Sequence, residues 1–287
     1  MKIVRNVMLG FSFAFAASSL VTAQEMQGPP KVLQVTREFL KPGKSGAMHD
    51  KSESNFVTAM TRAKWTTRYL ALNSLSGKSR ALYLTGYDSF DAWEKDYAAV
   101  MKNSALAAEL DKDSVADGEL LDGLDQIVFT YDEDKSYRAN HSLAMSHYME
   151  ISSFTIKPGH AKEFDELVKL VIDTHKKAGT SAHWATYEIA YGGDNEFAVL
   201  TDDKSMADID TGFAEDKQFR DALGDEGMKK LHALETDCIE SSDYELFAFN
   251  PKQSYAPDEW VKANPDFWKP KAMAPVAKPA PAAKPAQ

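Results

Sequence analysis

The chain has 287 residues, of which 44% are hydrophobic and 26% charged, enough apolar material for one large or two modest domains. Acidic residues outnumber basic ones by 43 to 33, and the resulting formal charge of −10 argues against nucleic acid as a partner. The single cysteine, Cys238, excludes an internal disulfide, so the apolar core must hold the fold together.

Residues 1–23 have the order of regions found in a secretory signal peptide. Basic Lys2 and Arg5 precede an apolar run from Val7 to Val21, and small residues follow up to Ala23. The alternative is an uncleaved anchor, but this run is shorter than the ~20 residues of a membrane span. We predict cleavage after Ala23, which lowers the formal charge from −10 to −12, and a periplasmic or secreted product without a membrane span.

Residues 24–131 are predicted to form a first unit with the order strand, helix, strand, strand, helix, strand, which is that of a ferredoxin-like domain. Alternation of apolar residues, turn residues such as Gly77, and the N-cap candidate Ser89 mark the boundaries. The predicted strands are 32–40, 66–75, 80–85 and 126–131, and the predicted helical segments are 45–64, 90–110 and 116–121.

An acidic, apolar-poor linker is predicted over 132–146, after which the same order of elements returns over 147–250. Gly179 stands where a helix C-cap is expected, after a clearly amphipathic segment. The predicted strands are 148–156, 182–190, 196–201 and 244–249, and the predicted helical segments are 161–178, 206–213, 217–223 and 227–234.

Three pairs of landmarks in these units lie 116 positions apart. Lys41-Pro42-Gly43 corresponds to Lys157-Pro158-Gly159, the strand 81–85 to 197–201, and Ser89 to Ser205. A constant offset over separated landmarks is typical of an internal repeat. The sequence therefore predicts an α+β protein made of two tandem ferredoxin-like (βαββαβ) repeats.

The composition changes after the second unit. Residues 251–270 are rich in aromatic residues and proline, and we predict a strap packed on the second repeat, with one helical turn at 258–263. Residues 271–287 contain almost only Ala, Pro and Lys, which is typical of a disordered tail.

The stretch from Tyr148 to Phe164, with a strand, Lys-Pro-Gly and a helix, resembles the opening of NIPSNAP-like proteins. More broadly, it resembles the dimeric α/β-barrel superfamily, which includes antibiotic-biosynthesis-monooxygenase-like proteins. The segment from Phe197 to Met206 is similar to the third strand and second helix of that family. The resemblance implies two units that place their sheets face to face as a pseudo-symmetric barrel, in a monomer or a homodimer. Its members include cofactor-free monooxygenases, haem-using enzymes and isomerases.

A comparison of the two repeats indicates where they diverge. Ser52 and Asn55 stand where the second repeat has Val168 and Val171. Because a buried unpaired polar group costs roughly 1–3 kcal/mol, we predict that Ser52 and Asn55 bind a ligand in a cleft between helix and sheet, or else face water. His49 is expected to point outward.

Two histidines of the second repeat are candidate catalytic residues. His175 lies on an apolar helix face and His183 near Trp184 and Tyr187 on a strand. A base or a haem ligand is one interpretation of the histidines, and Trp184 and Tyr187 could bind a flat ligand. The alternative for all four is core packing.

We predict a protein that binds a small apolar or aromatic molecule in a helix–sheet cleft. The alternative is a cofactor-free or haem-dependent monooxygenase-like enzyme that uses His175 or His183, with Asn55 orienting the substrate. No metal site is predicted, because the spacings of His141, His147 and His160 fit no metal-binding pattern and the acidic residues are expected on exposed helix faces.

Overall fold

The computed structural model describes residues 28–139 and 143–269. The first half contains β1 (Val32–Leu40), α1 (Ala47–Ala63), β2 (Tyr69–Ser74), β3 (Arg80–Tyr87), α2 (Phe90–Lys102), α3 (Ser104–Gly118) and β4 (Leu121–Tyr137). The second half contains η1 (Leu143–Met145), β5 (Tyr148–Ile156), α4 (Ala161–Ala178), β6 (Trp184–Tyr191), β7 (Glu196–Asp203), α5 (Met206–Cys238) and β8 (Ile239–Phe249). Two short helices, α6 (Asp258–Ala263) and α7 (Pro265–Trp268), follow.

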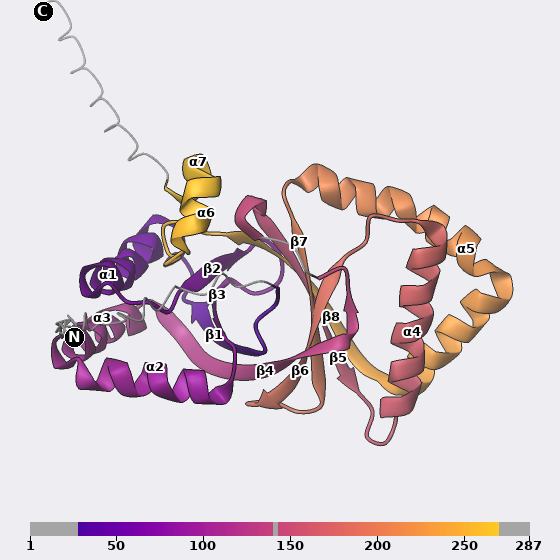
Figure 1. Ribbon diagram of the computed structural model, residues 1–287, viewed down its shortest axis with the longest axis horizontal. Coiled ribbons are helices and arrows are strands. Elements are labelled where there is room, and N and C mark those ends of the chain that lie inside the picture. The colour runs from indigo at the N-terminus through magenta and orange to yellow at the C-terminus, as the bar shows by residue number, and fades with distance from the viewer. Residues whose placement is uncertain (1–27, 140–142, 270–287) are drawn as a thin grey trace, which may run out of the picture.

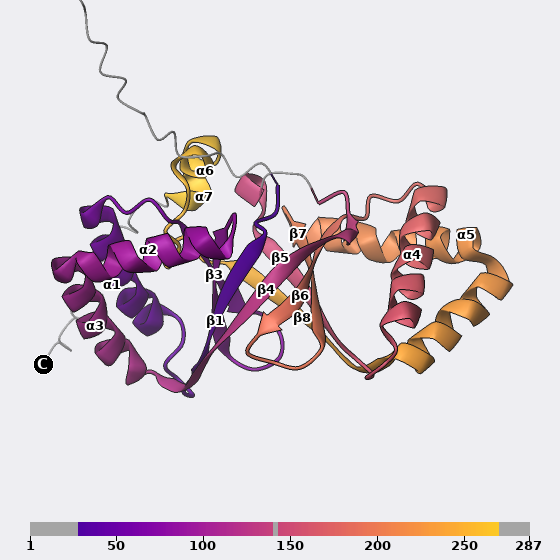
Figure 2. The same cartoon turned by 60° about the horizontal axis from the view of Figure 1, so that its bottom comes forward.

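The strands close into an antiparallel barrel in the order β1-β3-β2-β8-β5-β7-β6-β4. Helices α1, α2 and α3 lie on one side of the barrel, and α4 and α5 on the other (Figures 1 and 2). This arrangement confirms the predicted α+β class and the predicted barrel. Within the described residues, no helix is long and apolar enough to cross a membrane.

The two halves use the same strand order and register. The first half contributes β4-β1-β3-β2 and the second β8-β5-β7-β6, joined where β2 meets β8 and β4 meets β6. Val35 lies opposite Leu84 in the first half, and Ile151 lies opposite Leu200 in the second, 116 positions later in both strands. The pairing of β1 with β4 shifts register after Phe39, and the pairing of β5 with β8 shifts register at the matching position, after Thr155.

Alternate residues of each strand face the barrel interior, where the main apolar core lies. Leu33 and Val35 belong to this core, whereas Val32 packs outside the barrel against α2. Other buried members of the core are Leu72, Leu82, Leu84, Ile127, Phe129, Met149, Tyr187, Ala198, Phe247, Phe249 and Trp268. Glu38 is an even number of residues after Val32, so its side chain lies on the same face of β1 and faces the helices.

The repeated Lys-Pro-Gly phrase has the same structural role in both halves. Lys41 Nζ donates to the Glu119 carbonyl at 3.0 Å, just beyond α3, and Lys157 Nζ donates to the Thr236 carbonyl at 2.6 Å in the last turn of α5. A cation at the end of a helix stabilises the unpaired carbonyls there. The phrase thus ties a strand end to a helix end in each half.

The segment after β8 packs differently from the prediction. We expected it on the second repeat, but its first residues lie against the first half: Tyr255 Oη donates to the Trp65 carbonyl at 2.8 Å. Further on, Trp268 enters the barrel core and its Nε1 donates to the Ala144 carbonyl at 2.7 Å. The segment therefore spans both halves and covers one end of the barrel. The predicted helical turn at 258–263 is confirmed.

Several predicted boundaries also change. β4 extends to Tyr137 and pairs with β6, so residues 132–137 of the predicted linker are strand. The helix predicted over 90–110 is divided at Asn103, whose side chain caps α3. Three predicted segments join into α5, which is broken at Gly224 by a φ of 70°. The predicted signal peptide and tail lie outside the described residues.

Candidate functional site: two helix–sheet cavities of opposite character

Each half of the molecule has a cavity between its helices and the outer face of the barrel. The cavity of the first half has a volume of about 520 Å³ and that of the second about 550 Å³. Acidic and hydroxyl side chains are prominent in the first cavity, which includes Glu38, Glu53, Phe56, Met60, Tyr69, Tyr83, Ser114 and Asp117 in its wall.

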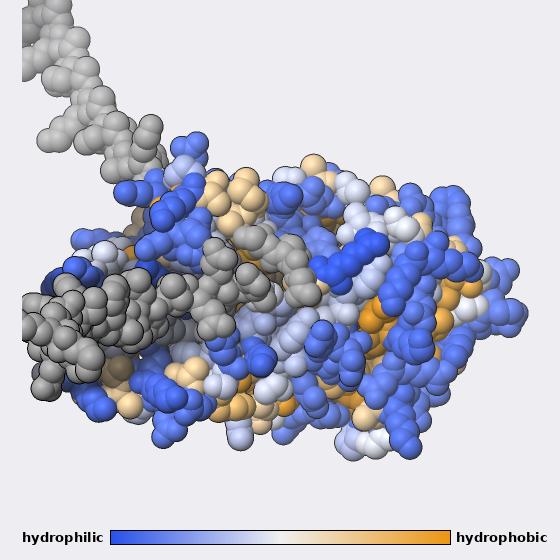
Figure 3. Space-filling view, viewed as in Figure 1, coloured by the Kyte–Doolittle hydropathy of each residue, from blue (hydrophilic) through white to orange (hydrophobic). Residues whose placement is uncertain are grey.

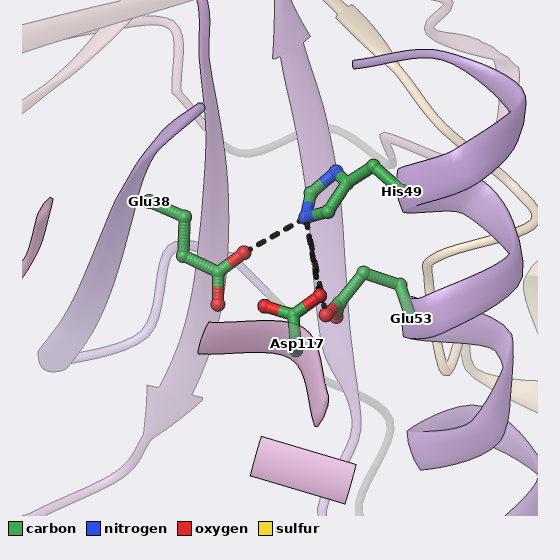
Figure 4. Close-up of side chains that lie close together, drawn as sticks. All are labelled: Glu38, His49, Glu53 and Asp117. Carbon is green, nitrogen blue, oxygen red and sulfur yellow. Dashed lines mark hydrogen bonds and ion pairs between the residues drawn. The ribbon is translucent and has the colours of Figure 1, made fainter. Parts of the chain in front are cut away.

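Four ionisable side chains lie close together (Figure 4), and the three carboxyl groups among them border the first cavity. Glu38 comes from β1, His49 and Glu53 from successive turns of α1, and Asp117 from the last turn of α3. His49 and Glu53 share one helix face because they are four residues apart. We call Glu38, His49, Glu53 and Asp117 the acidic cluster.

His49 is at the centre of the acidic cluster. Its Nε2 lies 3.0 Å from Glu38 Oε2, 3.8 Å from Asp117 Oδ1 and 4.0 Å from Glu53 Oε1. Its Nδ1 lies 3.2 Å from the side-chain nitrogen of Gln253. The second ring nitrogen is therefore oriented by the segment that follows β8.

The acidic cluster is almost fully removed from water. His49 is 0% exposed, Asp117 2%, Glu53 4% and Glu38 8%. Among the described residues, no lysine or arginine is ion-paired with any of the three carboxyl groups. Burial, reinforced by the charges of Glu38 and Asp117, raises the pKa of Glu53 to about 9. Burial also raises the pKa of Glu38, against the hydrogen bond from His49.

Several buried oxygens around the acidic cluster have no hydrogen-bond partner among the described residues. They are Glu53 Oε1, Asp117 Oδ1, Asp113 Oδ2 and the hydroxyls of Tyr69 and Tyr83. Leaving one buried polar group unpaired costs roughly 1–3 kcal/mol, and most buried polar groups in proteins are paired. Such a concentration beside a cavity is typical of a binding site.

The second cavity has a mainly apolar wall, which also includes Lys135, Thr186, Glu235, Thr236 and Ser242. Phe164 and Leu167 are buried, while Phe154, Val168, Val171 and Trp184 are only partly buried. Figure 3 shows hydrophobic surface in the hollow beside α4. Lys135, at the same cavity, is held by Asp132 at 2.8 Å and Asp165 at 2.9 Å.

One position shows how the two cavities came to differ. Glu38 and Phe154 occupy the same place in β1 and β5, 116 positions apart, and both face the helices. The helix ends lie 115 positions apart, since Lys64 caps α1 and Gly179 caps α4. With that offset, His49 corresponds to Phe164 and Glu53 to Val168. Corresponding positions of the strand and the helix thus carry acidic groups in the first half and apolar groups in the second.

The structure separates the four predicted ligand-binding residues. Asn55 is exposed and Ser52 is half-buried, and neither borders the first cavity. Trp184 borders the second cavity, and its Nε1 donates to the Lys135 carbonyl at 2.9 Å. Tyr187 is 2% exposed and packs inside the barrel, beside a separate cavity of about 110 Å³ at the barrel end.

Neither candidate catalytic histidine borders the second cavity. His175 Nδ1 lies 2.8 Å from Thr180 Oγ1, and its ring packs against Tyr137 and Phe219. The ring nitrogens of His183 face the carbonyls of Ser181 and Asp202, at 3.3 and 2.9 Å. Interaction with Asp202 raises the pKa of His183 to about 9, and an imidazolium has no lone pair for iron. The hydrogen bonds and the positive charge of His183 do not fit haem ligation.

Sequence reasoning missed the acidic cluster. The expectation that His49 points outward is wrong, and so is the assignment of all acidic residues to exposed faces, because Glu53 and Asp117 are buried. The available signals were the i, i+4 spacing of His49 and Glu53 and the replacement of Phe154 by Glu38 in the first repeat. The offset of 116 that relates the strands is one residue too many for α1, because the caps of α1 and α4 lie 115 positions apart.

Comparisons with known proteins identify the fold. No protein-family profile matches the sequence, and no curated protein matches it. A candidate monooxygenase from Fusobacterium nucleatum is 15% identical, with a TM-score of 0.50 over 77% of this chain and 93% of that one. A candidate monooxygenase from Lactobacillus acidophilus is 9% identical, with a TM-score of 0.46 over 76% and 93%. A mutant chlorite dismutase from Candidatus Nitrospira defluvii is 10% identical, with a TM-score of 0.45 over 82% and 95%.

These similarities concern the fold, which is the dimeric α+β barrel. At such identities, the reaction of a neighbour does not transfer to this chain, because one fold supports many functions.

Proposed function

We propose that the protein binds a small apolar or aromatic molecule in the cavity of the second half. The observation that carries this proposal is a cavity of about 550 Å³ between α4, α5 and the sheet whose wall includes partly buried apolar side chains. Removing apolar surface from water stabilises a complex by roughly 25 cal/mol per Å². Trp184 gives a flat aromatic surface for such a ligand.

An enzyme of the monooxygenase type is the other candidate that we considered. The Fusobacterium nucleatum neighbour is described as a candidate monooxygenase, but the likeness is one of fold. His175 and His183 do not border the cavity, so no observation at this site favours the enzymatic function. Binding is therefore the function that we propose.

We further propose that the two halves arose by tandem duplication and that the product is exported. The duplication is supported by the shared strand register at an offset of 116. Export is supported by the basic, apolar and small-residue regions of residues 1–23. The relation to NIPSNAP-like proteins rests on the Lys-Pro-Gly phrase and its flanking elements.

A fluorescent apolar probe tests the binding proposal. N-phenyl-1-naphthylamine should bind saturably with enhanced fluorescence, and Val168→Trp, which fills the cavity, should weaken binding at least tenfold. Val115→Trp, at a position on α3 that is 75% exposed, adds the same side chain elsewhere and should leave binding unchanged. Absence of probe binding, or equal binding by Val168→Trp and the wild type, would contradict the proposal.

A further inference from the structure

The acidic cluster gathers three carboxyl groups around one histidine, and among the described residues no lysine or arginine is ion-paired with them. Glu38, Glu53 and Asp117 are all buried, and Asp117 is in the last turn of α3, where the helix dipole is also negative. Taking an unpaired carboxylate out of water is costly. The charge must therefore be neutralised, either by protons or by a cation.

The ligand atoms of the acidic cluster lie nearly close enough together to share one ion. One ligand atom from each of the four residues lies within 4.8 Å of the other three. Two atoms that both bind an ion at about 2.1 Å lie at most about 4.2 Å apart, and the three measured distances from His49 Nε2 range from 3.0 to 4.0 Å. Small side-chain movements would close the remaining gaps.

Two oxygens of the acidic cluster lie within ion-pair distance of His49 but beyond hydrogen-bond length, which indicates room for a ligand between them. Glu53 Oε1 and Asp117 Oδ1 lack hydrogen-bond partners among the described residues, although Glu53 is only 4% and Asp117 only 2% exposed. Both residues also border the cavity of about 520 Å³. An ion could thus reach these oxygens, and part of its coordination sphere would face the cavity.

From these observations we propose that Glu38, His49, Glu53 and Asp117 bind one divalent first-row transition-metal ion, such as Mn²⁺ or Zn²⁺. Three carboxylates more than balance the charge of the ion, and the imidazole favours a transition metal over Mg²⁺ or Ca²⁺. The site is separate from the apolar cavity of the second half and extends the proposed function to metal binding.

Gln253 is suited to orient the metal-binding histidine. A histidine that binds a metal through Nε2 carries its proton on Nδ1 and donates it to a neighbouring acceptor. Gln253 Oε1 is buried without a partner among the described residues, and rotation of the amide brings it to His49 Nδ1. Asp50, which then loses the Gln253 donor, keeps the hydrogen bond from Asn250 and the ion pair with Lys252.

Isothermal titration calorimetry tests the metal site directly. Full-length mature protein is treated with EDTA, dialysed, and titrated with MnCl₂, ZnCl₂ and MgCl₂. We expect one equivalent of Mn²⁺ or Zn²⁺ to bind, and Mg²⁺ to bind at least tenfold more weakly. Glu53→Gln and Asp117→Asn, which keep the side-chain shape, should each weaken Mn²⁺ binding at least tenfold.

The matched control is Asp203→Asn, which changes a carboxyl group that is 6% exposed and lies outside the acidic cluster. This variant should bind Mn²⁺ like the wild type. Binding of N-phenyl-1-naphthylamine to the second cavity, together with circular dichroism, verifies that each variant is folded and keeps the two proposals distinguishable. Absence of saturable binding, or equal Mn²⁺ affinity in Glu53→Gln, Asp117→Asn and the wild type, would overturn the metal site.

Discussion

A single strand position accounts for much of the difference between the two cavities. Glu38 and Phe154 occupy matching places and both face the helices. A phenylalanine there can join apolar neighbours, whereas a buried glutamate needs a hydrogen bond or a counter-charge. Glu38 Oε2 lies 3.0 Å from His49 Nε2, which is within hydrogen-bond distance. A glutamate at position 38 therefore needs polar neighbours such as those of the acidic cluster.

The interaction of His183 with Asp202 predicts that the free energy of unfolding depends on pH. The pKa of His183 is raised to about 9, mainly by the hydrogen bond with Asp202, from an ordinary value of 6.5. The folded state thus binds this proton more tightly than the unfolded state, so the stabilisation is complete below pH 6.5 and is lost as the pH rises through 9. One pKa unit corresponds to about 1.4 kcal/mol. Because the ring is partly exposed, we expect a loss of about 1–2 kcal/mol.

Urea unfolding at pH 6.5 and pH 9 measures this loss. His183→Gln should have a smaller decrease in the free energy of unfolding than the wild type. The nearby Asp203, whose pKa burial raises to about 7 against the charge of His183, destabilises the folded state of the wild type as it ionises between about pH 4 and 7. His232→Gln, at an exposed site, should behave as the wild type. Equal pH dependence in His183→Gln and the wild type would contradict the assignment.

At the scale of elements, α1 and α4 show which parts of the site the sequence can predict. The apolar face of α4 identifies its buried side, and the predicted bounds 161–178 agree with the structure. The buried face of α1 includes His49, Glu53 and Ala59, so apolar periodicity gives little information about it. Asp117 was inaccessible to this reasoning because only the packing of α3 against α1 brings it to His49.

The segment with α6 and α7 is predicted to stabilise the barrel. Trp268 is 5% exposed, packs in the barrel core and donates to the Ala144 carbonyl. Truncation of a buried tryptophan typically costs about 3–5 kcal/mol, so Trp268→Ala should lower the free energy of unfolding by about 3 kcal/mol. Urea unfolding measures this change.

Phe213→Ala is the control for that experiment, because Phe213 is 77% exposed. Its effect should stay within about 0.5 kcal/mol. A cost below about 1 kcal/mol for Trp268→Ala would show that the segment contributes little to the stability of the barrel.

At the scale of the whole molecule, one chain supplies all eight strands of the closed barrel. The recurrence of the Lys-Pro-Gly phrase, a strand and a serine cap with one offset predicts two like units, and the resemblance to dimeric α/β-barrel proteins implies that their sheets form a barrel. The sequence does not predict that β4 extends to Tyr137, because this extension depends on the pairing of Asp132 with Thr186 and of Tyr137 with Trp184 in β6. Such tertiary pairing overrides local composition.

The intrachain closure predicts a monomer. Both contacts between the halves, β2 with β8 and β4 with β6, are already made within the chain. Native mass spectrometry of the mature protein at low micromolar concentration should therefore give the mass of a single chain. A dimer that persists on dilution would indicate that each half pairs with another chain instead.

The central claim is that the two halves share a strand order but differ in the side chains of their cavities, and that the first half contains a metal site. Anomalous X-ray diffraction at the zinc edge, on crystals of the full mature chain grown with ZnCl₂, tests this claim most directly. We predict a peak enclosed by Glu38, His49, Glu53 and Asp117, with bonds of about 2.0–2.2 Å to oxygen and nitrogen. Zinc peaks confined to the protein surface, with none in the acidic cluster, would contradict the account.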